Sequence, residues 1–113
     1  MRGDEARVVS AFCTYLESAG WTVETEVDGC DVVARRDEET MHAEAKGRTA
    51  AAGLDIDTMY GQLLRRMTAP PGLRNRYAVV VPDSLARLVT RVPKEVRERL
   101  AIDVFLVSED NEV

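Results

Sequence analysis

The chain has 113 residues, a length that suits one domain around one hydrophobic core. Its formal net charge of −5 argues against a protein that coats nucleic acid non-specifically. No apolar run approaches the ~20 residues of a membrane span, and the charged N-terminus lacks the hydrophobic region of a signal peptide. With only Cys13 and Cys30 as thiols, we expect a cytoplasmic protein with reduced cysteines and no membrane partner.

The first part of the chain predicts one helix and one strand. Residues 4–19 carry apolar side chains at helical spacing, and Gly20 is suited to end the helix. Residues 21–27 alternate apolar with polar side chains, which is typical of a half-buried strand. Two further short apolar runs, 30–34 and 41–46, predict the next two strands.

The rest of the chain predicts alternating helices and strands. An apolar stripe from Ile56 to Met67 has the spacing of a helix with one buried face, ending before the Pro-Pro-Gly segment at 70–72. The continuous apolar run 77–81 suits a strand covered on both faces. Two short helices, from Asp83 or Ser84 to about Arg91 and from Pro93 to Leu100, precede a last strand at 101–107. The order is α-β-β-β-α-β-α-β, an α/β fold.

Two carboxylates and one ammonium group lie on the two central apolar runs. Asp31 opens the first run, and Glu44 and Lys46 close the second, where side-chain alternation places them on one face. Carboxylate oxygens hold hard divalent cations, and a lysine can stabilise developing charge or orient an attacking water. The same residues could instead decorate an exposed strand, although lysine is scarce here, since 13 of the 15 basic residues are arginine.

The hairpin register decides whether these side chains meet. A two-residue loop at 37–38 places Asp31 opposite Glu44, with Cβ atoms roughly 4.5–5.5 Å apart. A loop at 38–39 places Asp31 opposite Lys46, still on the same face. A three-residue loop sends Asp31 to the other face unless a bulge restores it.

The element order together with Asp31 and Glu44-Ala45-Lys46 resembles the PD-(D/E)XK nuclease superfamily, the restriction-endonuclease-like folds that include Holliday-junction resolvases and RecB-type nuclease domains. The resemblance implies one domain over 1–113, with a central mixed sheet of about five strands flanked by helices. It also implies Mg²⁺ or Mn²⁺ held by Asp31 and Glu44, with the Ala45 carbonyl as a further ligand and Lys46 as the motif lysine.

Three more residues enter as candidates. Gln62 matches a glutamine that some branches carry on the helix after the third strand, and Glu5 can serve as the first-helix glutamate of others. Gln62 is otherwise a solvated polar position. His42, the only histidine, lies on the Glu44 face and is either a hydrogen-bonded strand residue or a water-activating base. A zinc site from Cys13, Cys30 and His42 is conceivable but matches no ligand spacing.

The chain also departs from the superfamily pattern. Cys30 stands where many members have proline, and Arg66 stands four residues after Gln62, where the RecB-type pattern prefers tyrosine. The overall charge is acidic, which is unusual for a stand-alone nuclease.

We therefore expect a metal-dependent nuclease that cuts DNA. Arg48, Arg65 and Arg66 are candidate contacts to the nucleic-acid backbone, and a homodimer or larger protein partner would extend the small footprint. Two alternatives stay open. One is a catalytically inactive nuclease-fold domain that binds a protein within a restriction or defence system, and the other is an unrelated small α/β domain.

Overall fold

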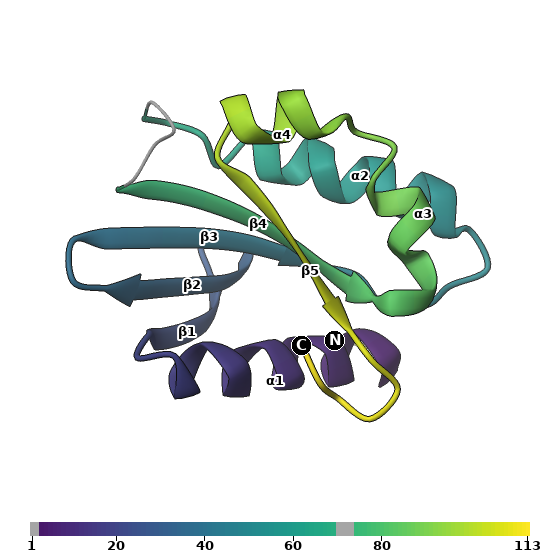
Figure 1. The fold of residues 1–113 in the computed structure, drawn as a ribbon, viewed down its shortest axis with the longest axis horizontal. Coiled ribbons are helices and arrows are strands. Elements are labelled where there is room, and N and C mark those ends of the chain that lie inside the picture. Colours follow the sequence, from purple (N-terminus) through teal and green to yellow (C-terminus); the bar gives the residue numbers. More distant parts are fainter. Residues whose placement is uncertain (1–2, 70–73) are drawn as a thin grey trace.

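A five-stranded mixed sheet lies between helices on both of its faces (Figure 1). The computed structural model describes residues 3–69 and 74–113. The helix α1 (Gly3–Ser18) covers one face, and α2 (Ala52–Leu64), α3 (Ala86–Val89) and α4 (Lys94–Arg99) lie on the other. No helix within the described ranges is long and apolar enough to cross a membrane.

The strands follow one another across the sheet in chain order. The first three form an antiparallel meander, whereas the third, fourth and fifth pair in parallel. Their bounds are β1 (Thr22–Val27), β2 (Cys30–Arg36), β3 (Glu39–Ala45), β4 (Asn75–Pro82) and β5 (Ile102–Val107). The predicted fold class, the mixed sheet of five strands and the order α-β-β-β-α-β-α-β are confirmed.

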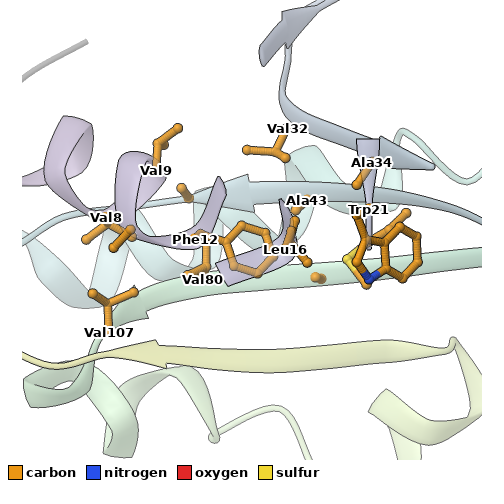
Figure 2. Close-up of a cluster of buried hydrophobic side chains, with 14 residues drawn as sticks. Val8, Val9, Phe12, Leu16, Trp21, Val32, Ala34, Ala43, Val80 and Val107 are labelled. Carbon is orange, nitrogen blue, oxygen red and sulfur yellow. The ribbon is translucent and has the colours of Figure 1, made fainter. Parts of the chain in front are cut away.

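The helix α1 packs its apolar stripe onto the sheet (Figure 2). Val8, Phe12 and Leu16 are buried at spacings of four residues and meet Val32 of β2 and Val80 of β4. These positions share one side of the helix because residues four apart lie one turn above each other. The packing fixes the first turn of α1 against the sheet.

The stripe predicted for the second helix is confirmed, but the helix lies earlier than expected. Ile56 and Leu63 are buried against β4, whereas the helix begins at Ala52 and ends at Leu64. Asp55 lies in its first turn, and Asp57 lies deeper in the helix. Met67 follows the helix and still packs on this core. The predicted stop at 70–72 lies outside the described residues.

The predicted helix beginning near Asp83 forms as a 3-10 turn, η1 (Asp83–Leu85), followed by the short α3. In β4, Val80 packs with the buried side chains of α1, while Val79 and Val81 pack with those of α2 on the other face. Both faces of this strand are therefore covered, which explains its continuous apolar run.

Two tight turns set the register of the meander. Val27 pairs with Cys30 across Asp28-Gly29, whose φ values of 49° and 80° suit a two-residue hairpin turn with the twist of the strands. Arg36 pairs with Glu39, which leaves a two-residue loop at 37–38. Of the three registers considered for this hairpin, the one with the loop at 37–38 is formed.

Candidate functional site

The two predicted carboxylates meet at the end of the β2–β3 hairpin. The ladder that pairs Arg36 with Glu39 runs on to pair Val32 with Ala43, so that the next position outward sets Asp31 opposite Glu44. The Oδ2 atom of Asp31 accepts a hydrogen bond of 2.9 Å from the Ala45 N–H. Asp31 therefore lies across the end of β3 and reaches the backbone of the motif that contains Glu44.

Glu44 is the one buried charged residue in the described part of the chain, with 2% of its surface exposed. Burial, which is the largest cause, and the negative charge of Asp31 together raise the pKa of its carboxyl to about 7, although Arg66 lowers it in part. A positive charge nearby stabilises the ionised form of such a carboxyl.

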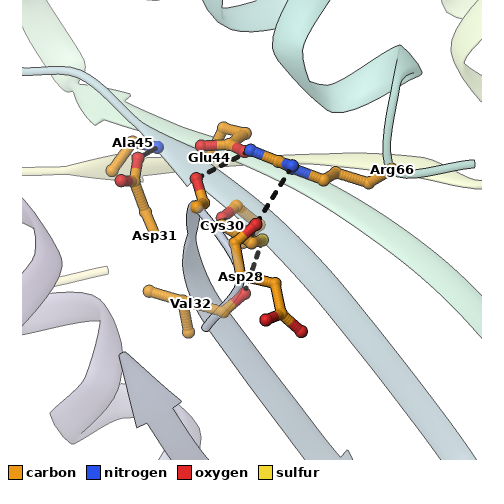
Figure 3. A network of polar contacts seen from close by, with 9 residues as sticks. Asp28, Cys30, Asp31, Val32, Glu44, Ala45 and Arg66 are labelled. Atoms are coloured by element: carbon orange, nitrogen blue, oxygen red, sulfur yellow. Dashed lines mark hydrogen bonds and ion pairs between the residues drawn. The ribbon is translucent and has the colours of Figure 1, made fainter. Parts of the chain in front are cut away.

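In this structure the cation beside Glu44 is Arg66, which follows the end of α2 (Figure 3). Its Nε donates to Oε1 of Glu44 at 3.1 Å. The Nη2 atom donates to the Gly29 carbonyl at 2.7 Å, and Nη1 lies 3.4 Å from the Asp28 carbonyl. The Arg66 guanidinium, a candidate contact to the nucleic-acid backbone, is bonded to groups of the protein in this structure.

Lys46 and Glu5 lie together at the same end of the sheet. The Nζ atom of Lys46 is 4.0 Å from Oε1 of Glu5, in the first turn of α1, and both side chains are about three-quarters buried. Burial raises the pKa of Glu5, and the charge of Asp31 adds to the increase. Lys46 lies one residue beyond β3, yet its N–H still pairs with the Val80 carbonyl at 3.1 Å.

A close backbone approach makes this arrangement possible. Gly47 follows the motif lysine, and a Cβ atom at this position would lie 2.6 Å from the carbonyl carbon of Asp4 and would also clash with the Glu5 nitrogen. Only glycine lets the chain pass so close to the first turn of α1. The next N–H, of Arg48, donates to the Asp4 carboxylate at 2.6 Å and closes the junction.

Gly47→Ala is expected to destabilise the protein by about 1–3 kcal/mol, because a methyl group would meet backbone atoms that cannot move aside. Urea unfolding measures the change. Gly61→Ala is the matched control, since nothing lies within 4 Å of a Cβ there. In the middle of α2 it should stabilise by about 0.5–1 kcal/mol. Equal effects of the two variants would contradict the close approach.

A hollow of about 610 Å³ opens beside this junction. It is lined by Asp4, Glu5, Lys46, Gly47, Arg48, Thr49 and Asp55. The Arg48 side chain is more than half exposed at its wall, 4.0 Å from Asp4. Lys46 is accessible from this hollow, while Asp31 and Glu44 lie outside its lining.

A second hollow, of about 300 Å³, lies beyond Arg66 on the α2 side of the sheet. Arg65, which is exposed, and His42, which is half-buried, both line it. His42 stacks on Tyr77 with ring centroids 6.0 Å apart. Burial lowers the pKa of its imidazole, and the charges of two arginines lower it further, which favours the neutral ring at pH 7.

Gln62 is half-buried on α2, but no hydrogen bond among the described residues joins it to Asp31, Glu44 or Lys46. The structure therefore brings together Asp31, Glu44, Lys46 and Glu5. In the part of the chain that the structure describes, Gln62 has no hydrogen bond to any of the three predicted motif residues among these.

The donor set suits magnesium better than zinc. Within residues 3–69 and 74–113, no group of three or more His, Cys, Asp or Glu side chains is arranged to hold a metal ion. Mg²⁺ usually needs only one or two carboxylates and keeps several waters, so the Asp31–Glu44 pair fits it. The Cys30 thiol is buried, and burial raises its pKa to about 11. It lies within hydrogen-bond distance of two backbone carbonyls as a donor. The conceivable zinc site with Cys13 and His42 is not formed.

Two features of the site were missed by sequence reasoning. The pairing of Arg66 with Glu44 joins residues 22 positions apart, and its only sequence signal was the departure from tyrosine at position 66. The contact of Gly47 with the first helix left no signal beyond a glycine after the motif lysine.

Comparison with known proteins supports the fold. No protein-family model matches the chain, and no curated protein matches it. An XisH family protein from Nostoc punctiforme PCC 73102 superimposes with a TM-score of 0.61 at 19% identity, over 94% of each chain. An fdxN element excision controlling factor protein from Anabaena variabilis gives a TM-score of 0.63 at 18% identity, over 95% of each chain. The chain is therefore similar in fold to these two proteins over nearly its whole length.

Proposed function

We propose that this protein is a small PD-(D/E)XK-type nuclease that hydrolyses phosphodiester bonds in DNA with Mg²⁺ or Mn²⁺. The observation that carries the proposal is the hairpin register, which sets Asp31 opposite Glu44. Lys46 follows directly after the same strand, two residues beyond Glu44. A carboxylate pair beside an ammonium group has the composition that a metal-assisted attack on a phosphodiester requires.

Asp31 and Glu44 would hold the ion, with the Ala45 carbonyl as a further ligand. A bound divalent ion supplies Lewis-acid polarisation of a phosphoryl oxygen and a water of lowered pKa. Lys46 lies at the hollow through which a phosphodiester can enter, and its ammonium would neutralise charge that develops on the phosphate. Glu5, 4.0 Å from Lys46, would orient that ammonium.

The residues around the centre would position the substrate. Arg48 at the wall of the larger hollow and Arg65 at the smaller one would contact phosphates, which fixes position and not sequence. Gln62 would orient the phosphate from α2. One domain of this size covers little duplex, so a homodimer or a larger protein partner would complete recognition. One fold neighbour is named for controlling the excision of an element, and a nuclease role is compatible with that name.

A second function is favoured by a specific observation. Arg66 already neutralises Glu44, and Asp31 already accepts a backbone N–H, so both carboxylates have partners without a metal ion. An inactive nuclease-fold domain that binds a protein in an excision, restriction or defence system would have the same arrangement.

Asp31→Ala is expected to abolish both Mn²⁺ binding and Mn²⁺-dependent nicking of a supercoiled plasmid. Isothermal titration calorimetry measures the binding. Asp31→Asn should fail equally, although its amide oxygen can still accept the Ala45 N–H, so that loss of charge is separated from loss of structure. Asp57→Ala is the control, because Asp57 pairs with Arg91 on an exposed surface away from the site.

The outcomes separate the two functions. Saturable binding and nicking that both depend on Asp31 support the nuclease. Binding of Mn²⁺ without nicking of any duplex, nicked or single-stranded DNA would contradict the catalytic proposal. No binding at millimolar Mn²⁺ would favour the protein-binding domain.

A further inference from the structure

The least accessible carboxylate of the site is already paired with a positively charged side chain. Glu44 is 2% exposed, and the Arg66 Nε lies 3.1 Å from its Oε1 atom. Arg66 itself is mostly buried, so this ion pair is shielded from water and from screening by salt. A solvated surface arginine would be free to leave, whereas Arg66 is held.

The guanidinium is held by more than its charge. It also donates to the carbonyls of Asp28 and Gly29, the two turn residues that join β1 to β2 (Figure 3). A Cβ atom at Gly29 would be in van der Waals contact with Nη2, at 3.4 Å. One side chain therefore links the end of α2, the β1–β2 turn and the carboxylate beside Asp31.

The position of Arg66 conflicts with a second cation on the same oxygen atoms. A divalent ion on Glu44 would meet the guanidinium at short range, and like charges repel strongly where water is excluded. Conversely, an unpaired Glu44 carboxylate would be costly to bury in the metal-free protein. The two cations would compete for the Glu44 carboxylate.

We propose that Arg66 is an intrinsic counter-ion that occupies Glu44 in the metal-free protein and that a divalent cation must displace. Arg66 thereby neutralises the charge of Glu44 in the metal-free site, and binding of the ion releases the link between α2 and the β1–β2 turn. This inference rests on the proposed metal-binding function and adds to it a built-in inhibitory contact.

The test compares Mg²⁺ affinity, measured by calorimetry at pH 8, in the wild type and in Arg66→Gln. The variant is expected to bind at least about tenfold more tightly, since a hydrogen bond to a charged group is commonly worth a tenfold factor or more. Arg66→Lys keeps a cation with fewer donors, so its affinity should lie between the two. Arg35→Gln is the matched control, because it breaks an exposed arginine–glutamate pair that does not involve Glu44.

A second readout follows the side chain directly. The Nε–H resonance of Arg66, identified by its loss in Arg66→Gln, should shift as Mg²⁺ is added to the wild type and saturate with the calorimetric affinity. Suppose that the wild type binds Mg²⁺ in a way that depends on Asp31. An equal or weaker Mg²⁺ affinity of Arg66→Gln would then overturn the counter-ion role and leave the metal site standing. An absence of Mg²⁺ binding in both proteins would overturn the metal site and the counter-ion role together.

Discussion

Glu44→Gln is expected to remove a pH dependence of the free energy of unfolding of about 3 kcal/mol between pH 4.5 and pH 7. The carboxyl has its ordinary pKa of 4.5 in the unfolded chain and a pKa raised to about 7 in the folded protein. Between these values the folded state keeps a proton that the unfolded state has released. The stability that Glu44 contributes is therefore complete below pH 4.5 and is lost as the pH rises to about 7.

Glutamine at position 44 cannot ionise, so the free energy of unfolding of the variant increases relative to that of the wild type as the pH rises from 4.5 to about 7. Urea unfolding at half-unit steps from pH 4.5 to pH 8 measures the difference. Glu24→Gln is the control, since Glu24 is exposed beside Arg35 on the neighbouring strands. A difference between Glu44→Gln and the wild type that stays constant with pH would show that Glu44 titrates as an ordinary carboxyl.

Phe12→Ala is expected to destabilise the protein by about 3–5 kcal/mol, the usual cost of emptying an aromatic site in a core. The Phe12 side chain has no exposed surface and lies between α1 and the sheet (Figure 2). Its ring centroid is 4.9 Å from that of Phe105. The same helix positions Glu5 in its first turn, so the substitution should also weaken the placement of Glu5 against Lys46.

Tyr15→Ala on the same helix is the matched control. Its ring contacts the same Phe105 at 5.9 Å, but Tyr15 is 40% exposed. Its removal should cost about 1 kcal/mol, because less apolar surface returns to water and no closed cavity forms. Urea midpoints with an unchanged denaturant slope measure both effects. Similar losses for Phe12→Ala and Tyr15→Ala would contradict the core position of Phe12.

The Asp31–Glu44 pair shows which part of the site could be predicted from local sequence patterns. A period of two along each strand placed Glu44 and Lys46 on one face, but the face of Asp31 depended on one loop. A two-residue loop at 37–38 was one of three registers considered. The buried face of β2 excludes only the three-residue loop, because the loop at 38–39 would keep the same side chains on the same faces. A slip by one residue would have turned Val32 and Ala34 out of the α1 core.

The limits of helix α2 show where the local patterns stopped. Its buried stripe was visible because it repeats every turn. Its ends were not, since neither end carries a side-chain cap or a proline among the described residues, and packing on the sheet decides where the helix stops.

The sequence by itself determined the element order, the two faces of the sheet and the residue types that could form a site. These follow from hydrophobic periodicity and turn chemistry, which act between near neighbours along the chain. Only the tertiary structure decided that Arg66 occupies Glu44, that Glu5 lies beside Lys46 and that Gln62 stands aside. The first two of these contacts join residues from 22 to 41 positions apart, and such distances are closed by the packing of helices on the sheet, which no local pattern records.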